Sequence, residues 1–401
     1  MGMGYKVSHA LTIATKFLNN LTMWYRRQNM RGQSTLIHQD NFGNYVMKGD
    51  PLTKTLNIYH LIVAPTYQCN LRCKHCYLSE FSQRILPKDI LLDLIDQWND
   101  IVTEEKGKYG GIFHLKGGEP FLIPYLDEVL KKLKEVGNLR LMITTNGTVI
   151  REDIFRELAE CKKALDRYVL LIVSLDGATE KTHSILRGEG NFEKTLKFLE
   201  KLREYEIDFQ LNCVLHDQNI YEIRDYIQLA KDYGAKQVNF LYFIPRGNGA
   251  NFASHQISHF EHFLAIKELY DKVDEKEKKL LTGSLPDLIC NGCKFSNECT
   301  AGYRGLLYIL PNGDVYPCPN TVYPEFRLGN ILKATLKAIL FNSISVYEKL
   351  KQFRGYGVCE GEKIYYLTNN RDKISLEEFS KYLKENFTGN FLNSYCYNRN
   401  W

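Results

Sequence analysis

The sequence predicts an α/β protein built on a parallel sheet. From about residue 56, short runs of Leu, Ile and Val alternate with longer segments whose apolar residues recur at helical spacing. The strands that this alternation predicts are residues 59–65, 111–116, 139–145, 168–175, 207–214 and 237–243. The predicted helices are residues 87–104, 123–136, 151–163, 191–205 and 219–233. Strands that are apolar along their whole length and alternate with helices are typical of a buried parallel sheet.

Six strands are too few to close an eight-stranded barrel. We therefore expect a partial (β/α)6 barrel, similar to an incomplete TIM barrel, over residues 56–250. An open doubly wound sheet is the alternative fold. A linker and a small cysteine-rich auxiliary domain with a β-hairpin are expected over residues 251–335, and a helical tail over residues 336–401.

Composition excludes several classes of protein. The chain has 401 residues, 44% of them hydrophobic and 25% charged, which is ordinary for a soluble globular protein. Its net charge of +5 is slight and gives no reason to expect a nucleic-acid partner. No apolar run reaches the roughly 18 residues that span a bilayer, and no signal peptide is predicted. The 11 cysteines are odd in number and clustered, which favours a reducing, cytoplasmic location.

The first 55 residues precede the barrel pattern. Residues 9–30 carry an apolar stripe that includes Leu11, Phe17, Leu21 and Trp24, which predicts an amphipathic helix. Such a stripe usually packs on a core or a partner. Residues 31–55 are polar and poorly periodic and are expected to connect this helical extension to the barrel.

Three cysteines follow the first predicted strand. Cys69, Cys73 and Cys76 have the spacing C-x3-C-x2-C on what should be a loop. A structural zinc site is closed by four protein ligands, whereas three cysteinates on a 4Fe–4S cluster leave one iron open to another ligand. The spacing also differs from that of ferredoxins and of zinc ribbons. These residues therefore predict an iron–sulfur site with a free coordination position.

This loop resembles the signature of the radical S-adenosylmethionine (SAM) enzymes. The resemblance covers roughly residues 59–245, because a Gly-Gly-Glu motif follows the second predicted strand and polar segments follow the later ones. It implies that a 4Fe–4S cluster on Cys69, Cys73 and Cys76 binds SAM. Reductive cleavage of SAM would then give a 5′-deoxyadenosyl radical that abstracts hydrogen from a substrate.

Four of the implied SAM-binding residues follow the second and third strands. Gly117 and Gly118 would let the backbone approach the ligand, and Glu119 would accept from the SAM ammonium. Asn146 lies at the level of the third strand's end, where it could face SAM or substrate. The alternatives are a strand-to-helix turn with a capping acid for the first three residues, and a turn-forming role for Asn146.

Three further residues are assigned through the same resemblance. Ser174 and Arg187 resemble the serine and arginine that hold the SAM ribose and carboxylate, and guanidinium suits a carboxylate. His75 stands where the family usually has an aromatic residue beside the adenine. The alternative for Arg187 is an unengaged surface position. Asp176 is expected only to shape its turn.

A second cysteine group lies after the barrel. Cys299, Gly313 and Cys318 match C-x13-G-x4-C, and Cys293 lies upstream of them. This pattern resembles the auxiliary-cluster extension called SPASM or its shorter relative, the twitch domain. The resemblance implies that these three cysteines are ligands of an auxiliary 4Fe–4S cluster. The second cysteine block of a full SPASM domain is missing, so only one auxiliary cluster is expected.

The fourth ligand of that cluster is expected to be Cys359, with Cys290 as its competitor. A zinc site built from Cys290, Cys293, Cys299 and Cys318 is the alternative, since four thiolates satisfy zinc. Around these cysteines the sequence predicts a hairpin between 306–310 and 315–316, and helices over 331–341 and 376–387.

The resemblance implies a radical SAM enzyme that modifies a ribosomally synthesised peptide by crosslinking, epimerisation or oxidation. A twitch-type small-molecule oxidoreductase or cyclase is the near alternative, and an iron–sulfur electron-transfer module is the non-enzyme alternative. An electron donor such as flavodoxin or ferredoxin is the expected partner. No acid or base that acts after hydrogen abstraction is identified from the sequence.

Overall fold

The computed structural model describes residues 37–39, 45–47, 59–79, 81–106, 110–165, 168–281 and 306–351. The chain divides into two units, Met1–Asp50 and Pro51–Trp401. In the first unit, strands β1 (Ile37–Gln39) and β2 (Tyr45–Met47) form an antiparallel pair. The sequence did not predict these strands, because three residues are too few to display an alternating pattern. The helix predicted over 9–30 lies outside the described residues.

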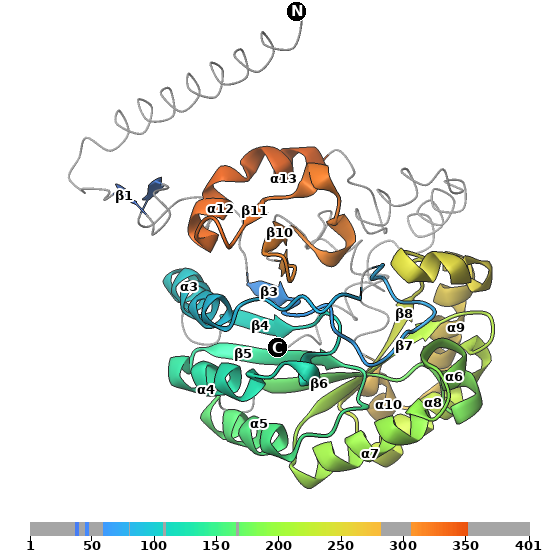
Figure 1. Ribbon diagram of the computed structural model, residues 1–401. Coiled ribbons are helices and arrows are strands. Elements are labelled where there is room, and N and C mark those ends of the chain that lie inside the picture. The colour runs from blue at the N-terminus through green and yellow to red at the C-terminus, as the bar shows by residue number, and fades with distance from the viewer. Residues whose placement is uncertain are drawn as a thin grey trace, which may run out of the picture. The chain divides into compact units, whose positions relative to one another are not determined.

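The second unit is organised around a nine-stranded sheet in the order β11-β10-β9-β3-β4-β5-β6-β7-β8 (Figure 1). Neighbouring strands from β3 to β8 are all parallel. The six predicted strands are confirmed as β3 (His60–Val63), β4 (Gly111–Leu115), β5 (Leu139–Thr145), β6 (Val169–Ser174), β7 (Phe209–Leu215) and β8 (Gln237–Tyr242).

Helices cover one face of these strands. The predicted helices are present as α3 (Lys88–Lys106), α4 (Leu126–Val136), α5 (Glu152–Ala164), α7 (Asn191–Glu204) and α8 (Ile223–Tyr233). Their apolar side chains share one buried cluster with alternate strand residues such as Leu61, Phe113 and Leu141. Because one face alone receives the helices, the partial barrel is confirmed over the doubly wound alternative.

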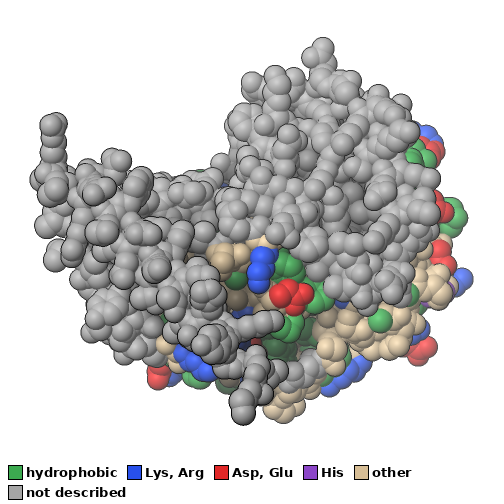
Figure 2. Space-filling model, turned by 90° about the horizontal axis from the view of Figure 1, so that it is seen from above, with side chains coloured by type: hydrophobic (Ala, Val, Ile, Leu, Met, Phe, Trp, Pro, Cys, Tyr) green, Lys and Arg blue, Asp and Glu red, His purple; other side chains and the backbone are tan. Residues whose placement is uncertain are grey.

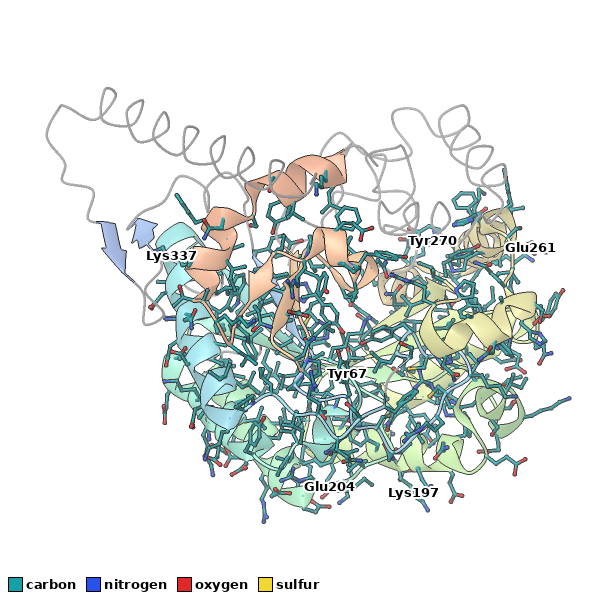
Figure 3. The ribbon with its side chains drawn as sticks, turned by 45° about the horizontal axis from the view of Figure 1, so that its top comes forward. Tyr67, Lys197, Glu204, Glu261, Tyr270 and Lys337 are labelled. Carbon is teal, nitrogen blue, oxygen red and sulfur yellow. The ribbon has the colours of Figure 1, made fainter. Side chains whose placement is uncertain are left out.

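The other face of the strands, which we call the inner face, is more polar. Its side chains alternate with those of the helix-covered core, as a period of two requires. On β4 to β8 it carries His114, Met142, Thr144, Ser174, Gln210, Asn212 and Asn239. Figure 2 shows basic, acidic and hydrophobic side chains of the described residues side by side on one part of the surface. Charged side chains of the outer helices, such as Lys197 and Glu204 of α7, point outward, whereas Tyr67 lies inside (Figure 3).

A short helix, α6 (Glu180–Arg187), lies between β6 and α7 and was not predicted. It has only eight residues, which show too little periodicity to be recognised. Thr179 caps it by accepting from the backbone N–H of Thr182. Two more helices, α9 (His259–Lys272) and α10 (Glu275–Leu280), follow β8. No helix in the described part of the chain is both long and apolar enough to cross a membrane.

The predicted hairpin extends the barrel sheet. Strands β9 (Leu306–Ile309) and β10 (Asp314–Tyr316) pair antiparallel, and β9 also pairs parallel with β3, placing Ile309 beside Val63. Strand β11 (Gly329–Asn330) completes this edge. Helices α12 (Leu336–Asn342) and α13 (Ile344–Lys351) follow. The helix predicted from residue 331 starts later, because Thr335 accepts from the N–H of Ala338 and caps α12. The helix predicted over 376–387 lies outside the described residues.

Candidate functional site

The three-cysteine loop leaves the carboxyl end of β3, as predicted. Cys73 is buried, whereas Cys69 and Cys76 are partly exposed. Burial raises the pKa of the Cys73 thiol to about 11, and neighbouring Arg187 opposes that shift. Burial also raises the thiol pKa of Cys69 and Cys76. The thiols therefore need a positive partner such as bound iron to become thiolates at neutral pH.

The Gly-Gly-Glu segment is packed against the chain that leads into this loop. The backbone N–H of Gly118 donates to the carbonyl of Thr66 at 2.9 Å, and that of Glu119 donates to the carbonyl of Gln68 at 2.7 Å. A Cβ atom on Gly118 would lie 2.0 Å from the Gln68 oxygen, so only glycine fits. Gly117 has φ +133°, a backbone conformation that also favours glycine. Both glycines are thus required by contacts within the protein itself.

Glu119 is fully buried, and its carboxylate receives three internal hydrogen bonds. Oε1 accepts from the N–H of Phe121 and from the hydroxyl of Thr145, while Oε2 accepts from the N–H of Asn146 at 2.8 Å. Burial raises the pKa of Glu119, and these donors oppose the shift. The side chain therefore fixes the end of β5, and its role toward a SAM ammonium stays a prediction.

Asn146 lies against the cysteine loop. Its side-chain NH₂ donates to Asn70 at 2.9 Å and faces the sulfur of Cys69 at 3.8 Å. The backbone N–H of Leu71 also faces that sulfur, at 3.4 Å. Donors of this kind stabilise a cysteinate that carries negative charge, which fits an iron–sulfur ligand. Its oxygen atom Oδ1 accepts from Thr148, so Asn146 also forms its turn.

The loop is held from the other side by the 3-10 helix η3 (Gly247–His255), which follows β8. The side chain of Asn248, which follows β8, donates to the carbonyl of Cys73 at 2.9 Å. The backbone N–H of Gly249 donates to the carbonyl of Cys76 at 2.9 Å. A Cβ atom on Gly249 would lie 2.9 Å from the carbonyl oxygen of His75, which makes this approach close. Residues far apart in sequence thus determine the shape of the cysteine loop.

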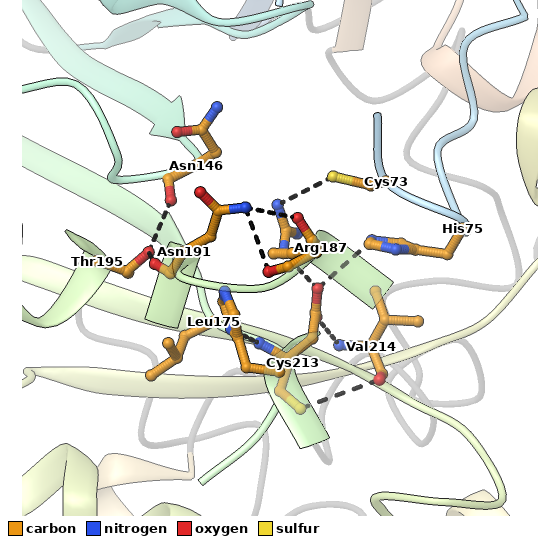
Figure 4. A network of polar contacts seen from close by, with 12 residues as sticks. Cys73, His75, Asn146, Leu175, Arg187, Asn191, Thr195, Cys213 and Val214 are labelled. Atoms are coloured by element: carbon orange, nitrogen blue, oxygen red, sulfur yellow. Dashed lines mark hydrogen bonds and ion pairs between the residues drawn. The ribbon is translucent and has the colours of Figure 1, made fainter. Parts of the chain in front are cut away.

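An ion pair that the sequence did not reveal joins Asp176 to Arg187, which lies near Cys73 and His75 of this loop (Figure 4). The Nε of Arg187, at the end of α6, donates to the Oδ2 of Asp176 at 2.5 Å, and its Nη1 lies 3.9 Å from the sulfur of Cys73. Asp176 is fully buried and also accepts from the N–H of Val214 at 2.8 Å. Burial alone would raise the pKa of Asp176, but Arg187 and His75 lower it to about 2.

Arg187 is therefore engaged, and the surface alternative for it is wrong. Burial would lower its pKa, but the charge of Asp176 more than offsets this effect, and the net shift is upward. Asp176 does more than shape a turn, because it is the counter-ion of this buried cation. The sequence did offer one signal for this ion pair: a carboxylate two residues after Ser174, at the end of a buried strand, needs a partner. Ser174 itself lies on the inner face and pairs in register with Asn212 of β7.

His75 lies beside this ion pair, with its side chain 11% exposed. Its Nε2 lies 3.5 Å from Oδ2 of Asp176, and burial lowers the pKa of the ring to about 4 despite that carboxylate. Its Nδ1 has no hydrogen-bond partner among the described residues. A buried ring nitrogen without a partner is costly and suits the polar group of a ligand. His75 is thus available for the adenine-side role that its position in the motif implies, which stays a prediction.

The second cysteine group is described only at Cys318, which is buried just after β10. Cys290, Cys293, Cys299 and Cys359 lie outside the described residues. Lys116, which directly follows β4, interacts electrostatically with Cys318 and with Cys76 of the first cysteine loop. Burial lowers the pKa of Lys116, whereas Cys76 and Cys318 both act to raise it. The pKa of this one lysine is thus influenced by cysteines of both sites.

A tyrosine pair also joins the two regions. The hydroxyls of Tyr77, which follows Cys76, and Tyr308 of β9 lie 3.2 Å apart. The ammonium of Lys116 lies 5.0 Å from the ring centre of Tyr77, within the range of a cation–π interaction. No sequence pattern indicates this contact, because Tyr77 and Tyr308 are separated by 231 positions.

No three His, Cys, Asp or Glu side chains within the described ranges stand close enough to hold a single metal ion. A 4Fe–4S cluster makes a different demand, since each cysteinate binds its own iron. The donor set fits such a cluster: three thiols on one loop, N–H groups aimed at Cys69, and a guanidinium beside Cys73.

Comparison with known proteins places this geometry in context. Residues 63–230 match the model of the radical SAM superfamily, and residues 299–362 match SPASM, an iron–sulfur cluster-binding domain. The chain is 29% identical over 304 residues to the subtilosin biosynthesis protein AlbA of Bacillus subtilis, covering 72% of this chain and 60% of AlbA. It is 29% identical to the mycofactocin maturase MftC of Mycolicibacterium smegmatis, covering 73% of this chain and 72% of MftC. It is 28% identical to an AdoMet-dependent heme synthase of Methanosarcina barkeri, covering 75% of this chain and 87% of that protein.

Two solved structures share the fold. Streptococcus suis SuiB bound to its precursor peptide SuiA superposes with a TM-score of 0.61 at 18% identity, covering 86% of this chain and 81% of SuiB. The protein anSMEcpe with bound AdoMet superposes with a TM-score of 0.58 at 22% identity, covering 73% of this chain and 83% of that chain.

Proposed function

Because the chain belongs to the radical SAM superfamily and carries a SPASM-type domain, we propose that it is a maturase of a ribosomally synthesised peptide. The observation that carries this proposal is that three features of the site lie at the same end of the barrel. The cysteine loop, the Gly117–Gly118 backbone and the Asp176–Arg187 pair all lie at the carboxyl end of one partial barrel. Ligands of parallel α/β folds bind at that end.

Cys69, Cys73 and Cys76 would hold the 4Fe–4S cluster, and the exposed iron would take SAM. When bound, these cofactors supply a 5′-deoxyadenosyl radical that abstracts hydrogen from the substrate. The protein itself would orient the bound cofactors and the substrate and exclude water from them. Asn146 and the N–H of Leu71 would compensate charge on Cys69, while Arg187 does so at Cys73. His75 and Ser174 would contact the SAM that is bound to that cluster.

The inner face suits a peptide. Ser174, Asn212 and Asn239 stand in register on three neighbouring strands. Gln210 donates to Asn212 at 2.6 Å, so these amides are ordered before a substrate enters. Amide side chains offer both donors and acceptors, which matches the alternating N–H and C=O groups of a peptide backbone. Relatives named for the biosynthesis of subtilosin and the maturation of mycofactocin support this substrate class.

For the SPASM-type region we propose one auxiliary 4Fe–4S cluster on Cys293, Cys299 and Cys318, with Cys359 or Cys290 as fourth ligand. This cluster would take up an electron from the substrate radical or bind the substrate. A flavodoxin or ferredoxin would reduce the first cluster, and the cysteine content favours the cytoplasm as the compartment. Anaerobic reconstitution should then give about eight irons per chain, two clusters of four. About four irons with one zinc would instead establish the zinc alternative.

The enzymatic proposal is tested with SAM and dithionite. Short peptides encoded beside the gene are synthesised and incubated with the reconstituted enzyme, and 5′-deoxyadenosine and peptide mass are measured. We expect 5′-deoxyadenosine together with a peptide that has lost hydrogen or changed its stereochemistry. The triple variant Cys69→Ala, Cys73→Ala, Cys76→Ala should give neither. Equal 5′-deoxyadenosine from this variant would overturn the proposal.

A small-molecule oxidoreductase is the second candidate function. The observation that favours it is the AdoMet-dependent heme synthase, which matches over 75% of this chain and 87% of its own length. The same assay discriminates the two. A small-molecule enzyme would leave every peptide unchanged. It would instead abstract a hydrogen atom from a low-molecular-weight substrate in a cell extract.

A further inference from the structure

Three polar side chains on neighbouring strands form a hydrogen-bonded line that the proposed site does not use. Nε2 of His60 on β3 lies 3.1 Å from Nδ1 of His114 on β4. Nε2 of His114 lies 2.8 Å from the hydroxyl of Thr144 on β5. The centres of the two imidazole rings are 5.2 Å apart and their planes are inclined by only 17°, so the rings lie nearly edge to edge.

Strand register makes this line run diagonally across the inner face. His114 pairs with Ile62, which is two residues beyond His60. His114 also pairs with Met142, which is two residues before Thr144. Each step along the line therefore rises by one inner-face position toward the carboxyl end of the sheet.

The two ends of the line lie in different places. Thr144 directly precedes Thr145 and Asn146, which bind Glu119 and contact the cysteine loop. His60 is the first residue of β3, at the opposite end of the strands. Thr144 and His60 are partly exposed, whereas His114 between them is buried. The line thus runs from Thr144, next to the candidate site, through the buried His114 to His60 at the far end of the sheet.

Both rings are held neutral. Burial lowers the pKa of His114 well below its ordinary value and that of His60 to about 4, and the charge of Lys116 acts in the same direction. A neutral imidazole has one N–H donor and one acceptor nitrogen. In this state Thr144 can donate to His114 while His114 donates to His60, or all three can reverse together. A hydrogen-bonded series with that property can pass a proton.

We propose that Thr144, His114 and His60 form a proton line that carries a proton from the substrate to the far end of the barrel. This inference rests on the proposed function, in the form in which a C–H carbon of the peptide is joined to a nucleophile. Joining a C–H carbon to a nucleophile, R–H + Nu–H → R–Nu + H• + H⁺ + e⁻, releases three species. The hydrogen atom would go to the radical that the bound cofactors supply, and the electron to the proposed auxiliary iron–sulfur cluster.

The proton is what this line accepts. Thr144 takes it from Nu–H as its own hydroxyl proton passes to Nε2 of His114. The proton on Nδ1 of His114 then moves to Nε2 of His60, and His60 releases a proton at its own end. Thr144 is the substrate-facing member, and the two histidines act through it.

The first test needs neither cofactor nor substrate. In the protein labelled with ¹⁵N-histidine, the bridging proton between His60 and His114 should show a coupling across the hydrogen bond. Its exchange with water is compared in the wild type, Thr144→Val and Thr144→Ser. We expect exchange to slow roughly tenfold in Thr144→Val, because proton transfer through the hydroxyl is lost, and to be kept in Thr144→Ser. A purely structural bridge exchanges by opening of the fold, so unchanged or faster exchange in Thr144→Val overturns the proposal.

The second test uses the reconstituted enzyme and the peptide modified in the assay above. Thr144→Val should still release 5′-deoxyadenosine, but modified peptide per 5′-deoxyadenosine should fall roughly 10²-fold, and Thr144→Ser should restore it. An unchanged ratio in Thr144→Val overturns the line. If the wild type releases no 5′-deoxyadenosine, the proposed function fails, and the exchange measurement alone decides the line. Thermal unfolding of both variants confirms that each is folded.

Discussion

Asp176 and Arg187 form a buried ion pair, with Oδ2 and Nε 2.5 Å apart at the end of β6. Arg187 reaches from this pair to the sulfur of Cys73. The carboxylate therefore has two consequences: it makes the burial of a guanidinium tolerable, and it places that guanidinium beside a proposed cluster ligand. The relationship links the stability of α6 to the chemistry of the cysteine loop.

Removing the charge of Asp176 should be strongly destabilising. Asp176→Asn leaves Arg187 buried without its counter-ion, which typically costs about 3–5 kcal/mol in free energy of unfolding. The measurement is urea unfolding of the apo protein. Glu268→Gln, which breaks an exposed pair with Lys272, is the control and should change stability by less than about 1 kcal/mol. Equal effects of the two variants would contradict the buried-pair account.

The same pair predicts a pH dependence. The pKa of Asp176 is lowered from 3.8 to about 2 in the folded protein, so its contribution to stability is present above about pH 4. As the pH falls through 2, the carboxyl becomes protonated in the folded state as well, and the contribution disappears. A shift of this size corresponds to roughly 2 kcal/mol. The stability difference between wild type and Asp176→Asn should therefore narrow between pH 4 and pH 2, whereas a constant difference would exclude this cause.

Gly118 should not tolerate a side chain. In Gly118→Ala the new Cβ would meet backbone oxygen of Gln68 at 2.0 Å, so the chain leading to Cys69 must move. Such overpacking typically costs about 1–3 kcal/mol. We also expect the iron bound after reconstitution to fall, because the cysteine loop is displaced.

Gly190→Ala is the matched control for Gly118→Ala. Gly190 has φ +71°, but a Cβ atom added to it would meet no other atom within 4 Å, so this variant reports backbone strain without a clash. It should cost about 1 kcal/mol and leave the iron content unchanged. If both variants lose iron equally, the close approach of Gly118 is not what shapes the loop.

Tyr308 should stabilise the contact between β9 and the cysteine loop. Tyr308→Phe removes a fully buried hydroxyl and leaves that of Tyr77 without this partner, at a cost of about 1–3 kcal/mol. Urea unfolding measures the loss. Tyr221→Phe is the control, since Tyr221 is 88% exposed and should change stability by less than about 0.5 kcal/mol. A neutral Tyr308→Phe would show that the hydroxyl pair contributes nothing.

Residues near one another in sequence account for what could be predicted. Runs such as Leu139–Thr145 have an apolar pattern that shows a strand without reference to the rest of the chain. The cysteine spacing likewise indicates a shared site. The parallel order of the strands follows from the helices between them. The fold class and the place of the cysteine loop are therefore contained in local pattern.

What could not be predicted depends on contacts between distant segments. Nothing in Leu306–Ile309 says that this strand pairs with β3 rather than with its hairpin partner alone. Asp176 resembles a turn residue until α6 brings Arg187 to it. His60 and His114 each resemble an isolated polar residue in a strand, and only register brings the two rings together. Buried polar pairs of this kind leave no periodic signal.

Asn146 should tune the reduction potential of the first cluster. Its NH₂ group and the N–H of Leu71 both face the sulfur of Cys69, and such donors raise cluster potentials by stabilising the more negative, reduced state. Asn146→Ala removes one donor. A loss of about 1 kcal/mol for that interaction corresponds to roughly 40 mV in a one-electron couple. We expect the midpoint, measured by redox titration with EPR detection, to become more negative by that amount.

The control for Asn146→Ala must remove an asparagine amide elsewhere. Asn342→Ala removes one that bonds the carbonyl of Ala338 within α12, and its midpoint should equal that of the wild type. Iron content is measured in both variants, so that a lost cluster is not mistaken for a shifted one. A full cluster with an unshifted midpoint in Asn146→Ala would mean that the amide serves only its bonds to Asn70 and Thr148. A shift would establish Asn146 as part of the electrostatic environment of the cluster.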